Sequence, residues 1–89
     1  MSSQAELNEY EKRQAYFSRV RALIMKIVNA RPGLTISQIS REFLLWYGFL
    51  PRIDNRIREL RKIGWVETVK EEDGLLHVYP KEIEENESC

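Results

Sequence analysis

The sequence predicts a mainly α-helical domain with a small β-hairpin: three helices, of which the first is extended, followed by a two-stranded hairpin. Three observations support this fold class. Apolar residues recur at helical spacing over most of the first 63 residues, and glycine and proline interrupt that spacing at two places. Further along, an Asp-Gly pair separates two short segments rich in valine and aromatic residues, which is typical of a hairpin.

The first helix is expected over residues 5–30, a span without glycine or proline. Its second half, residues 17–28, has the apolar density of a core helix. Its first half is mostly polar, with Leu7, Tyr10 and Tyr16 as apolar anchors. This half therefore either frays or packs on a second subunit.

A second helix is expected over residues 35–45, with Thr35 and Ser37 as candidate N-caps. The segment WYGFL, residues 46–50, then forms a turn in which Gly48 is free to adopt a positive φ. Its aromatic residues either fill the core between the helices or form an exposed contact patch. The third helix is expected over residues 51–63, with Pro51 at its first position and Gly64 ending it.

Two strands are expected over residues 65–70 and 75–79, joined by the Asp73-Gly74 turn. Residues 81–89 are acidic and poor in apolar side chains, so they are expected to be a disordered tail. The chain then divides into an N-terminal helix extension (1–14), one folded domain (15–80) and this tail (81–89).

The formal net charge is zero, but the charges are strongly segregated. Residues 12–62 hold twelve Lys and Arg against three acids, a net charge of +9. Residues 1–11 carry −3 and residues 63–89 carry −6. A cationic centre with acidic ends is compatible with a nucleic-acid partner, which the overall charge alone would argue against.

The third helix concentrates this cationic character. Ile53, Ile57 and Leu60 fall within a narrow arc and predict the buried stripe. Six cationic or amide side chains surround the rest of the helix: Arg52, Asn55, Arg56, Arg58, Arg61 and Lys62. A solvated helix surface is the simpler interpretation. Four arginines against one lysine favour contact with phosphate and guanine, because guanidinium groups bind both in a bidentate manner.

The order of these elements resembles the winged helix-turn-helix family of DNA-binding domains over roughly residues 17–79. LTISQISREF is similar to the first helix of the motif, RIDNRIRELRKIGWV to its recognition helix, and ETVKEEDGLLHVY to its wing. The resemblance implies a transcriptional regulator that reads the major groove of double-stranded DNA with the recognition helix.

Carried onto this chain, the resemblance places Arg52, Asn55 and Arg56 against the groove, with Arg58 one turn further. Arg can bind guanine O6 and N7 together, and Asn can bind adenine N6 and N7. Arg61, Lys62 and Arg41 are better placed for phosphates, which set affinity and register. On the hairpin, the plausible contacts are Lys70 and His77, although a lone histidine is more often structural.

Two features depart from the family pattern. The link between the two motif helices is about three residues longer than in compact motifs, because WYGFL is interposed. The tip of the wing carries Glu71, Glu72 and Asp73, which phosphates would repel. We therefore expect binding dominated by the recognition helix. The alternative is a winged-helix module that binds protein and never contacts DNA.

Other classes of function have little support. The single histidine and the single cysteine, Cys89, provide neither an internal disulfide nor a metal site, so Cys89 is either an idle thiol or part of an intermolecular disulfide. We find no catalytic constellation, cofactor motif or small-molecule signature. With no transmembrane run and no secretory signal at the N-terminus, a cytoplasmic protein is expected. A homodimer through the N-terminal helix is expected, because helix-turn-helix proteins commonly pair half-sites.

Overall fold

A computed structural model of the chain describes residues 8–81, which form three helices and a three-stranded antiparallel sheet. In chain order the elements are α1 (Glu9–Ala30), β1 (Leu34–Thr35), α2 (Ile36–Tyr47), α3 (Ile53–Lys62), β2 (Val66–Lys70) and β3 (Leu76–Pro80). The fold class is therefore confirmed. The start expected for the first helix at residues 5–7, most of the predicted acidic tail and Cys89 lie outside the described residues.

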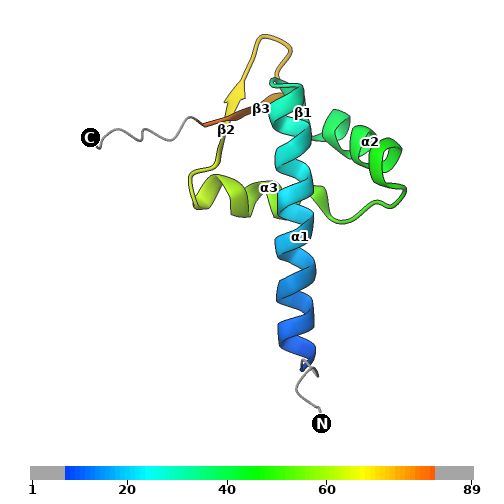
Figure 1. Ribbon diagram of the computed structural model, residues 1–89. Helices are drawn as coiled ribbons and strands as arrows, with labels where there is room; N and C mark the ends of the chain where they lie inside the picture. Colours follow the sequence, from blue (N-terminus) through cyan, green and yellow to red (C-terminus); the bar gives the residue numbers. More distant parts are fainter. Residues whose placement is uncertain (1–7, 82–89) are drawn as a thin grey trace, which may run out of the picture.

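Helix α1 is the longest element, and it packs against the rest of the domain from Phe17 onward (Figure 1). A capping box begins it: Asn8 Oδ1 accepts from the Glu11 amide at 2.7 Å, and Glu11 Oε1 accepts from the Asn8 amide at 3.2 Å. Buried residues begin at Val20, and residues 9–16 are exposed on every face. Residues 9–16 are thus helical but exposed within a single chain.

Helix α2 begins with a second capping box, formed by Thr35 and Gln38, so Thr35 is the N-cap. It continues two residues beyond the predicted end at residue 45 and stops at Gly48, whose φ is +81°. Trp46 and Tyr47 are therefore helical rather than part of the turn.

Helix α3 begins at Ile53, two residues after Pro51, and its N-cap Arg52 makes no side-chain capping bond. Its last helical residue is Lys62, one residue before the predicted end at residue 63, and its C-cap is Ile63 rather than Gly64. Gly64 follows directly, and the amides of Gly64 and Trp65 donate to the carbonyls of Arg61 and Leu60 at 3.1 and 2.9 Å. This pair of bonds is a Schellman motif, which needs the positive φ of Gly64, +86°.

The predicted hairpin is present, with β2 and β3 paired from Val66 opposite Pro80 to Lys70 opposite Leu76. A strand that the sequence pattern did not predict, β1, pairs with the other edge of β3, giving the order β1-β3-β2. Strand β1 has only two residues, which are too few to show an alternating pattern in the sequence. By pairing with β3, it joins the start of α2 to the hairpin.

The core lies where α2, α3 and the sheet meet the C-terminal half of α1 (Figure 1). It contains the predicted α3 stripe of Ile53, Ile57 and Leu60, all at most 3% exposed. The other buried apolar residues are Val20, Ile24, Ile27, Val28, Ile39, Phe43, Val66 and Val78. Three helices followed by a hairpin are compatible with a winged-helix-like fold. No helix within residues 8–81 combines the length and apolar character needed to cross a membrane.

The sequence left open whether the apolar residues around the α2–α3 link fill the core or form an exposed patch, and the structure shows some of them in each environment. Phe43 is fully buried, and the rings of Tyr47 and Phe49 pack edge-on against it at 4.9 and 5.2 Å between centroids. Leu45 and Leu50, in contrast, are 72% and 56% exposed. The longer link thus places one aromatic ring, Phe49, against the edge of the core while that residue stays 39% exposed, and it leaves a leucine-rich outer surface.

Candidate nucleic-acid interface

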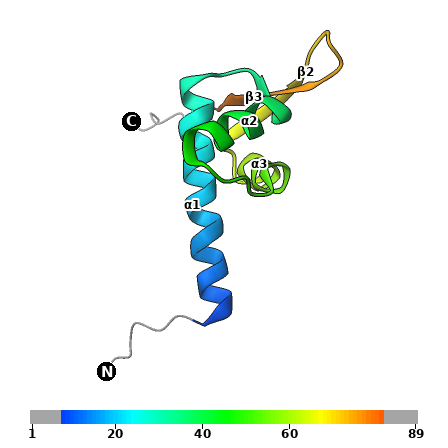
Figure 2. The same ribbon diagram turned by 90° about the vertical axis from the view of Figure 1, so that its right-hand side faces the viewer.

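The apolar stripe of α3 is buried in the core, and the side chains left on its exposed surface are mainly cationic. Arg58, Arg61 and Lys62 are exposed along the helix, and Arg52 is exposed at its start. In Figure 2, α3 and the hairpin lie on the same side of the domain, away from the axis of α1. We call the four side chains Arg52, Arg58, Arg61 and Lys62 the α3 basic face.

Arg56 was expected to be exposed on the DNA-contacting side of α3, but it is buried instead. It is only 8% exposed, and its guanidinium carbon lies 3.8 Å from the centroid of the Phe17 ring on α1. Its Nη2 donates to Glu59 Oε2 at 2.8 Å, and its Nε is buried without a partner within residues 8–81. Arg56 therefore fastens α3 to α1 and is not available to a groove.

Glu59 joins the same two helices through a second arginine. Its Oε1 accepts from Arg21 Nη1 of α1 at 2.8 Å, and its Oε2 accepts from Arg56. Partial burial acts to raise the pKa of Glu59, but the hydrogen bonds from Arg21 and Arg56 outweigh it and hold that pKa below its ordinary value of 4.5. The carboxylate therefore stays ionised and neutralises cations that do not belong to the α3 basic face.

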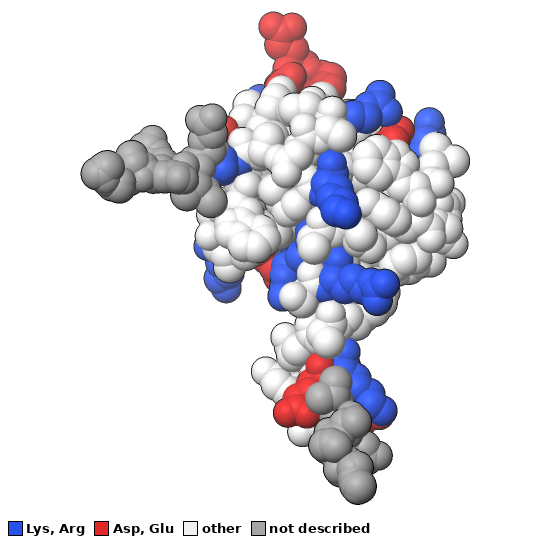
Figure 3. Space-filling model, viewed as in Figure 1, with Lys and Arg blue, Asp and Glu red and all other residues white. Residues whose placement is uncertain are grey.

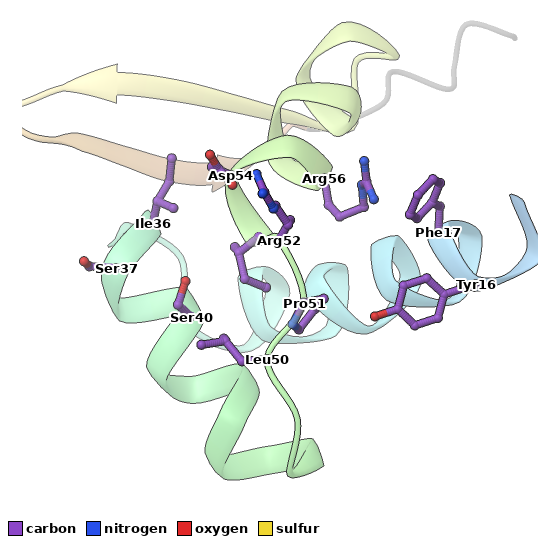
Figure 4. Close-up of a pocket in the computed structure, with 11 residues that line it drawn as sticks. Tyr16, Phe17, Ile36, Ser37, Ser40, Leu50, Pro51, Arg52, Asp54 and Arg56 are labelled. Carbon is purple, nitrogen blue, oxygen red and sulfur yellow. The ribbon is translucent and has the colours of Figure 1, made fainter. Parts of the chain in front are cut away.

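A hollow lies at the start of α3, between that helix, α1 and α2 (Figure 4). Tyr16 and Phe17 line it from α1, and Ser37 and Ser40 line it from α2. Leu50, Pro51, Arg52 and Asp54 complete its wall from the α2–α3 link and the first turn of α3. The hollow therefore joins the start of the basic face to the aromatic part of α1.

A second hollow lies between α3 and the hairpin. Ile36, Ile57 and Leu76 provide its apolar floor, while Asp54, Arg58, Arg61 and Thr68 provide its polar lining. Arg61 Nη1 donates to Thr68 Oγ1 of β2 at 3.4 Å. This bond directs Arg61 toward the hairpin, so the helix and the hairpin form one continuous surface.

The remaining predicted contact residues are spread around this surface. Asn55 follows Asp54 on α3 and is half-buried, Arg41 is exposed on α2, and Lys70 is exposed at the end of β2. The structure thus gathers four of the eight predicted residues on the α3 basic face and removes Arg56 to the helix interface. Asn55 is half-buried on α3, and Arg41 and Lys70 lie on other elements.

The hairpin tip is acidic, as its sequence indicates, and Asp and Glu side chains gather there in Figure 3. Two of its three acids make contacts within the hairpin. Glu71 accepts from the Tyr79 hydroxyl, a bond that raises the pKa of Tyr79 above its ordinary value. Asp73 Oδ1 accepts from the Leu75 amide at 3.0 Å, stabilising the turn, while Glu72 is exposed.

His77 is a structural residue of the sheet rather than an exposed contact. Its Nδ1 lies 2.6 Å from the Gly33 carbonyl and its Nε2 lies 2.8 Å from Asp73 Oδ2. Both partners accept hydrogen bonds, so both bonds form only when the imidazole is protonated. The Gly33 carbonyl and then Asp73 raise the pKa of His77, and the Leu75 amide and then His77 lower the pKa of Asp73.

Two parts of this surface escaped the sequence analysis. Thr68 had no local signal, because its role depends on the packing of β2 beside α3. Asp54 did have a local signal in the sequence, because it precedes Arg58 by four residues, the spacing of neighbours on one helix face. Within residues 8–81 no three His, Cys, Asp or Glu side chains lie close enough to hold a metal ion.

The sequence matches no known protein-family model and no curated protein with significance.

Proposed function

We propose that this chain binds double-stranded DNA through α3 and acts as a winged helix-turn-helix transcriptional regulator. The observation that carries the proposal is the α3 basic face: four exposed cationic side chains on a helix whose other side is fixed in the core. Such a helix fits the width of the major groove, and its guanidinium groups suit guanine edges and phosphates.

The proposed contacts follow the exposure of each side chain. Arg58, in the middle of the free face, and Arg52, at the start of the helix, are assigned to base edges together with Asn55. Arg61 and Lys62, in the last turn, are assigned to phosphates, as are Arg41 and Lys70. Arg56 is left out of the contact set because its guanidinium is occupied by Phe17 and Glu59.

Fluorescence anisotropy of a random-sequence duplex between about 50 and 200 mM salt tests this proposal. A protein that contacts phosphates loses affinity steeply over this range, and each lost phosphate contact reduces the slope of log affinity against log salt by about one. We expect the Arg52→Ala/Arg58→Ala variant to bind more weakly with a shallower slope. The matched control is Arg19→Ala/Lys26→Ala, which removes the same charge from exposed positions of α1.

Absence of binding at 50 mM salt contradicts the proposal, and so does an equal loss of affinity in both double variants. An equal loss would show that the net charge of the chain, and not the α3 basic face, attracts the duplex.

A protein-binding module is the second candidate. It is favoured by the acidic hairpin tip and by the exposed Leu45 and Leu50 beside the α2–α3 link. Such a module would keep its partner when Arg52 and Arg58 are changed to Ala. The salt dependence of duplex binding therefore separates the two candidates.

We also propose that the regulator is a homodimer joined through the N-terminal half of α1. This segment leaves the domain as a regular helix, and Tyr10 on it is 68% exposed. A large aromatic side chain on an unpacked helix gains stability when a second subunit covers it.

A further inference from the structure

Asp54 is the single acidic residue on the free face of α3. The other acid of this helix, Glu59, is turned toward α1, where Arg21 and Arg56 neutralise it. Asp54 is exposed and precedes Arg58 by one helical turn and Arg61 by two. All three side chains line the hollow between α3 and the hairpin, so a negative charge lies within the α3 basic face.

The carboxylate of Asp54 is available to a ligand. Arg61 directs its guanidinium to Thr68, and Arg21 and Arg56 direct theirs to Glu59, so no ion pair engages Asp54 within the described part of the chain. An acid in the first turn also stabilises a helix through the macrodipole, and α3 lacks a side-chain cap. Helix stabilisation requires only a negative charge in the first turn and no contact with a ligand. Experiment can therefore separate it from a role of Asp54 in ligand binding.

We propose that Asp54 determines sequence specificity by accepting a hydrogen bond from the N4 amino group of a cytosine in the major groove. This inference rests on the proposed function of α3 in DNA binding. A carboxylate only accepts hydrogen bonds, and cytosine presents a donor at its major-groove edge. Adenine places its N7 acceptor beside its amino group, guanine presents two acceptors and thymine presents O4, so each of these is a poorer partner.

The same carboxylate disfavours every other sequence. At a site without the cytosine, Asp54 enters the groove unpaired and faces base acceptors among phosphates of its own sign. Arg58, one turn further along α3, faces the adjacent base pairs and is suited to guanine. Asp54 therefore lowers the affinity for random DNA more than the affinity for the chosen site.

Selection of bound duplexes from a random pool tests this role in the full chain. The variants are Asp54→Asn, which keeps the shape of the side chain, and the control Glu67→Gln, which removes an exposed acid from β2. We expect Asp54→Asn to lose the cytosine preference at one position, and to shift it toward adenine, to which an amide can bind in a bidentate manner. The ratio of site affinity to random-duplex affinity should fall roughly five- to hundredfold.

A second variant, Asp54→Glu, keeps the charge at the start of the helix and should retain the preference for cytosine. Enrichment of the same motif by the wild type and by Asp54→Asn, with an unchanged affinity ratio, overturns the inference and leaves the proposed function intact. A lower melting temperature of Asp54→Asn with an unchanged motif assigns Asp54 to helix stability alone, which also overturns it. A wild type that enriches no motif overturns the inference, and salt-independent duplex binding in addition rejects the proposed function.

Discussion

The guanidinium of Arg56 lies over the ring of Phe17, with its central carbon 3.8 Å from the ring centroid, and this contact joins α3 to α1. The side chain of Arg56 is 10% exposed and its Nη2 is bonded to Glu59. The cation, the ring and the carboxylate therefore form one packed unit at the helix interface. This unit fixes the direction in which α3 presents its basic face.

Arg56→Ala should lower the free energy of unfolding by about 2 kcal/mol, because a desolvated cation–π contact and a charged hydrogen bond are both lost. Arg58→Ala, on the exposed face of the same helix, should change it by less than about 0.5 kcal/mol. Urea denaturation followed by tryptophan fluorescence compares the two variants. Equal stabilities of the two variants would contradict the assignment of Arg56 to the interface.

The position of Arg56 marks a limit of sequence-based prediction. The stripe of Ile53, Ile57 and Leu60 was predictable because helical periodicity alone defines it. Arg56 lies beside that stripe, and only its partner Phe17, 39 residues earlier on another helix, decides whether the long side chain faces inward or outward. The spacing of apolar residues in one segment holds no information about such a partner.

The caps and turns depend on neighbouring residues, whereas the sheet depends on residues distant in the sequence. The Thr35 cap and the glycine turn at Gly64 that follows α3 were predictable because all their partners lie within a few residues. The short strand β1 exists only because Leu34 pairs with Val78, 44 positions later. The fold class was therefore predictable, whereas the third strand and the exact members of the α3 basic face depended on tertiary packing.

Stability should depend on pH through His77, the one histidine of the chain. Its raised folded pKa means that its contribution is complete below its ordinary pKa of 6.5 and is lost as pH rises through the raised value. The lowered pKa of Asp73 means that its contribution is complete above 3.8 and is lost as pH falls through the lowered value. The pair therefore stabilises the hairpin most between about pH 4 and 6.5.

Thermal unfolding at pH 5.5 and 8.5 checks this window. Surface carboxylates with ordinary pKa values of about 4 and lysines with an ordinary pKa of about 10.4 are mostly charged at both pH values. The wild type should melt at a higher temperature at pH 5.5. In His77→Ala the difference between the two pH values should shrink, and a difference as large as in the wild type would contradict the role of His77.

The aromatic contact between Phe43 and Phe49 should stabilise the α2–α3 link. Phe49→Ala should cost about 1 to 3 kcal/mol of unfolding free energy, because the edge-on ring pair and the buried part of the side chain are lost. Leu45→Ala, at a 72% exposed position, should cost less than about 0.5 kcal/mol. Chemical denaturation of both variants tests this difference, and a larger loss for Leu45→Ala would indicate that another subunit covers the leucine surface.

Removal of residues 1–14 should convert the proposed dimer into a monomer without unfolding the domain. The first buried residue of α1 is Val20, and a chain beginning at Ala15 keeps Phe17 under Arg56. Light scattering measures the mass and circular dichroism checks the fold. As a narrower variant, Tyr10→Ser in the full chain should weaken association, since Tyr10 is the most exposed aromatic residue of the helix. A truncated chain that remains dimeric would place the interface elsewhere.

Glu72→Gln isolates the electrostatic effect of the hairpin tip, because Glu71 and Asp73 also make bonds within the hairpin and Glu72 is exposed. If α3 docks on a duplex, this charge lies near phosphates that repel it, so the variant should bind a random duplex roughly twofold more tightly at 50 mM salt. The gain should disappear toward 0.5 M salt, where the screening length is only about 4 Å. Glu67→Gln on β2 is the matched control. Unchanged or weaker binding of Glu72→Gln at low salt would mean that the tip lies away from the phosphates, leaving it free for a protein partner.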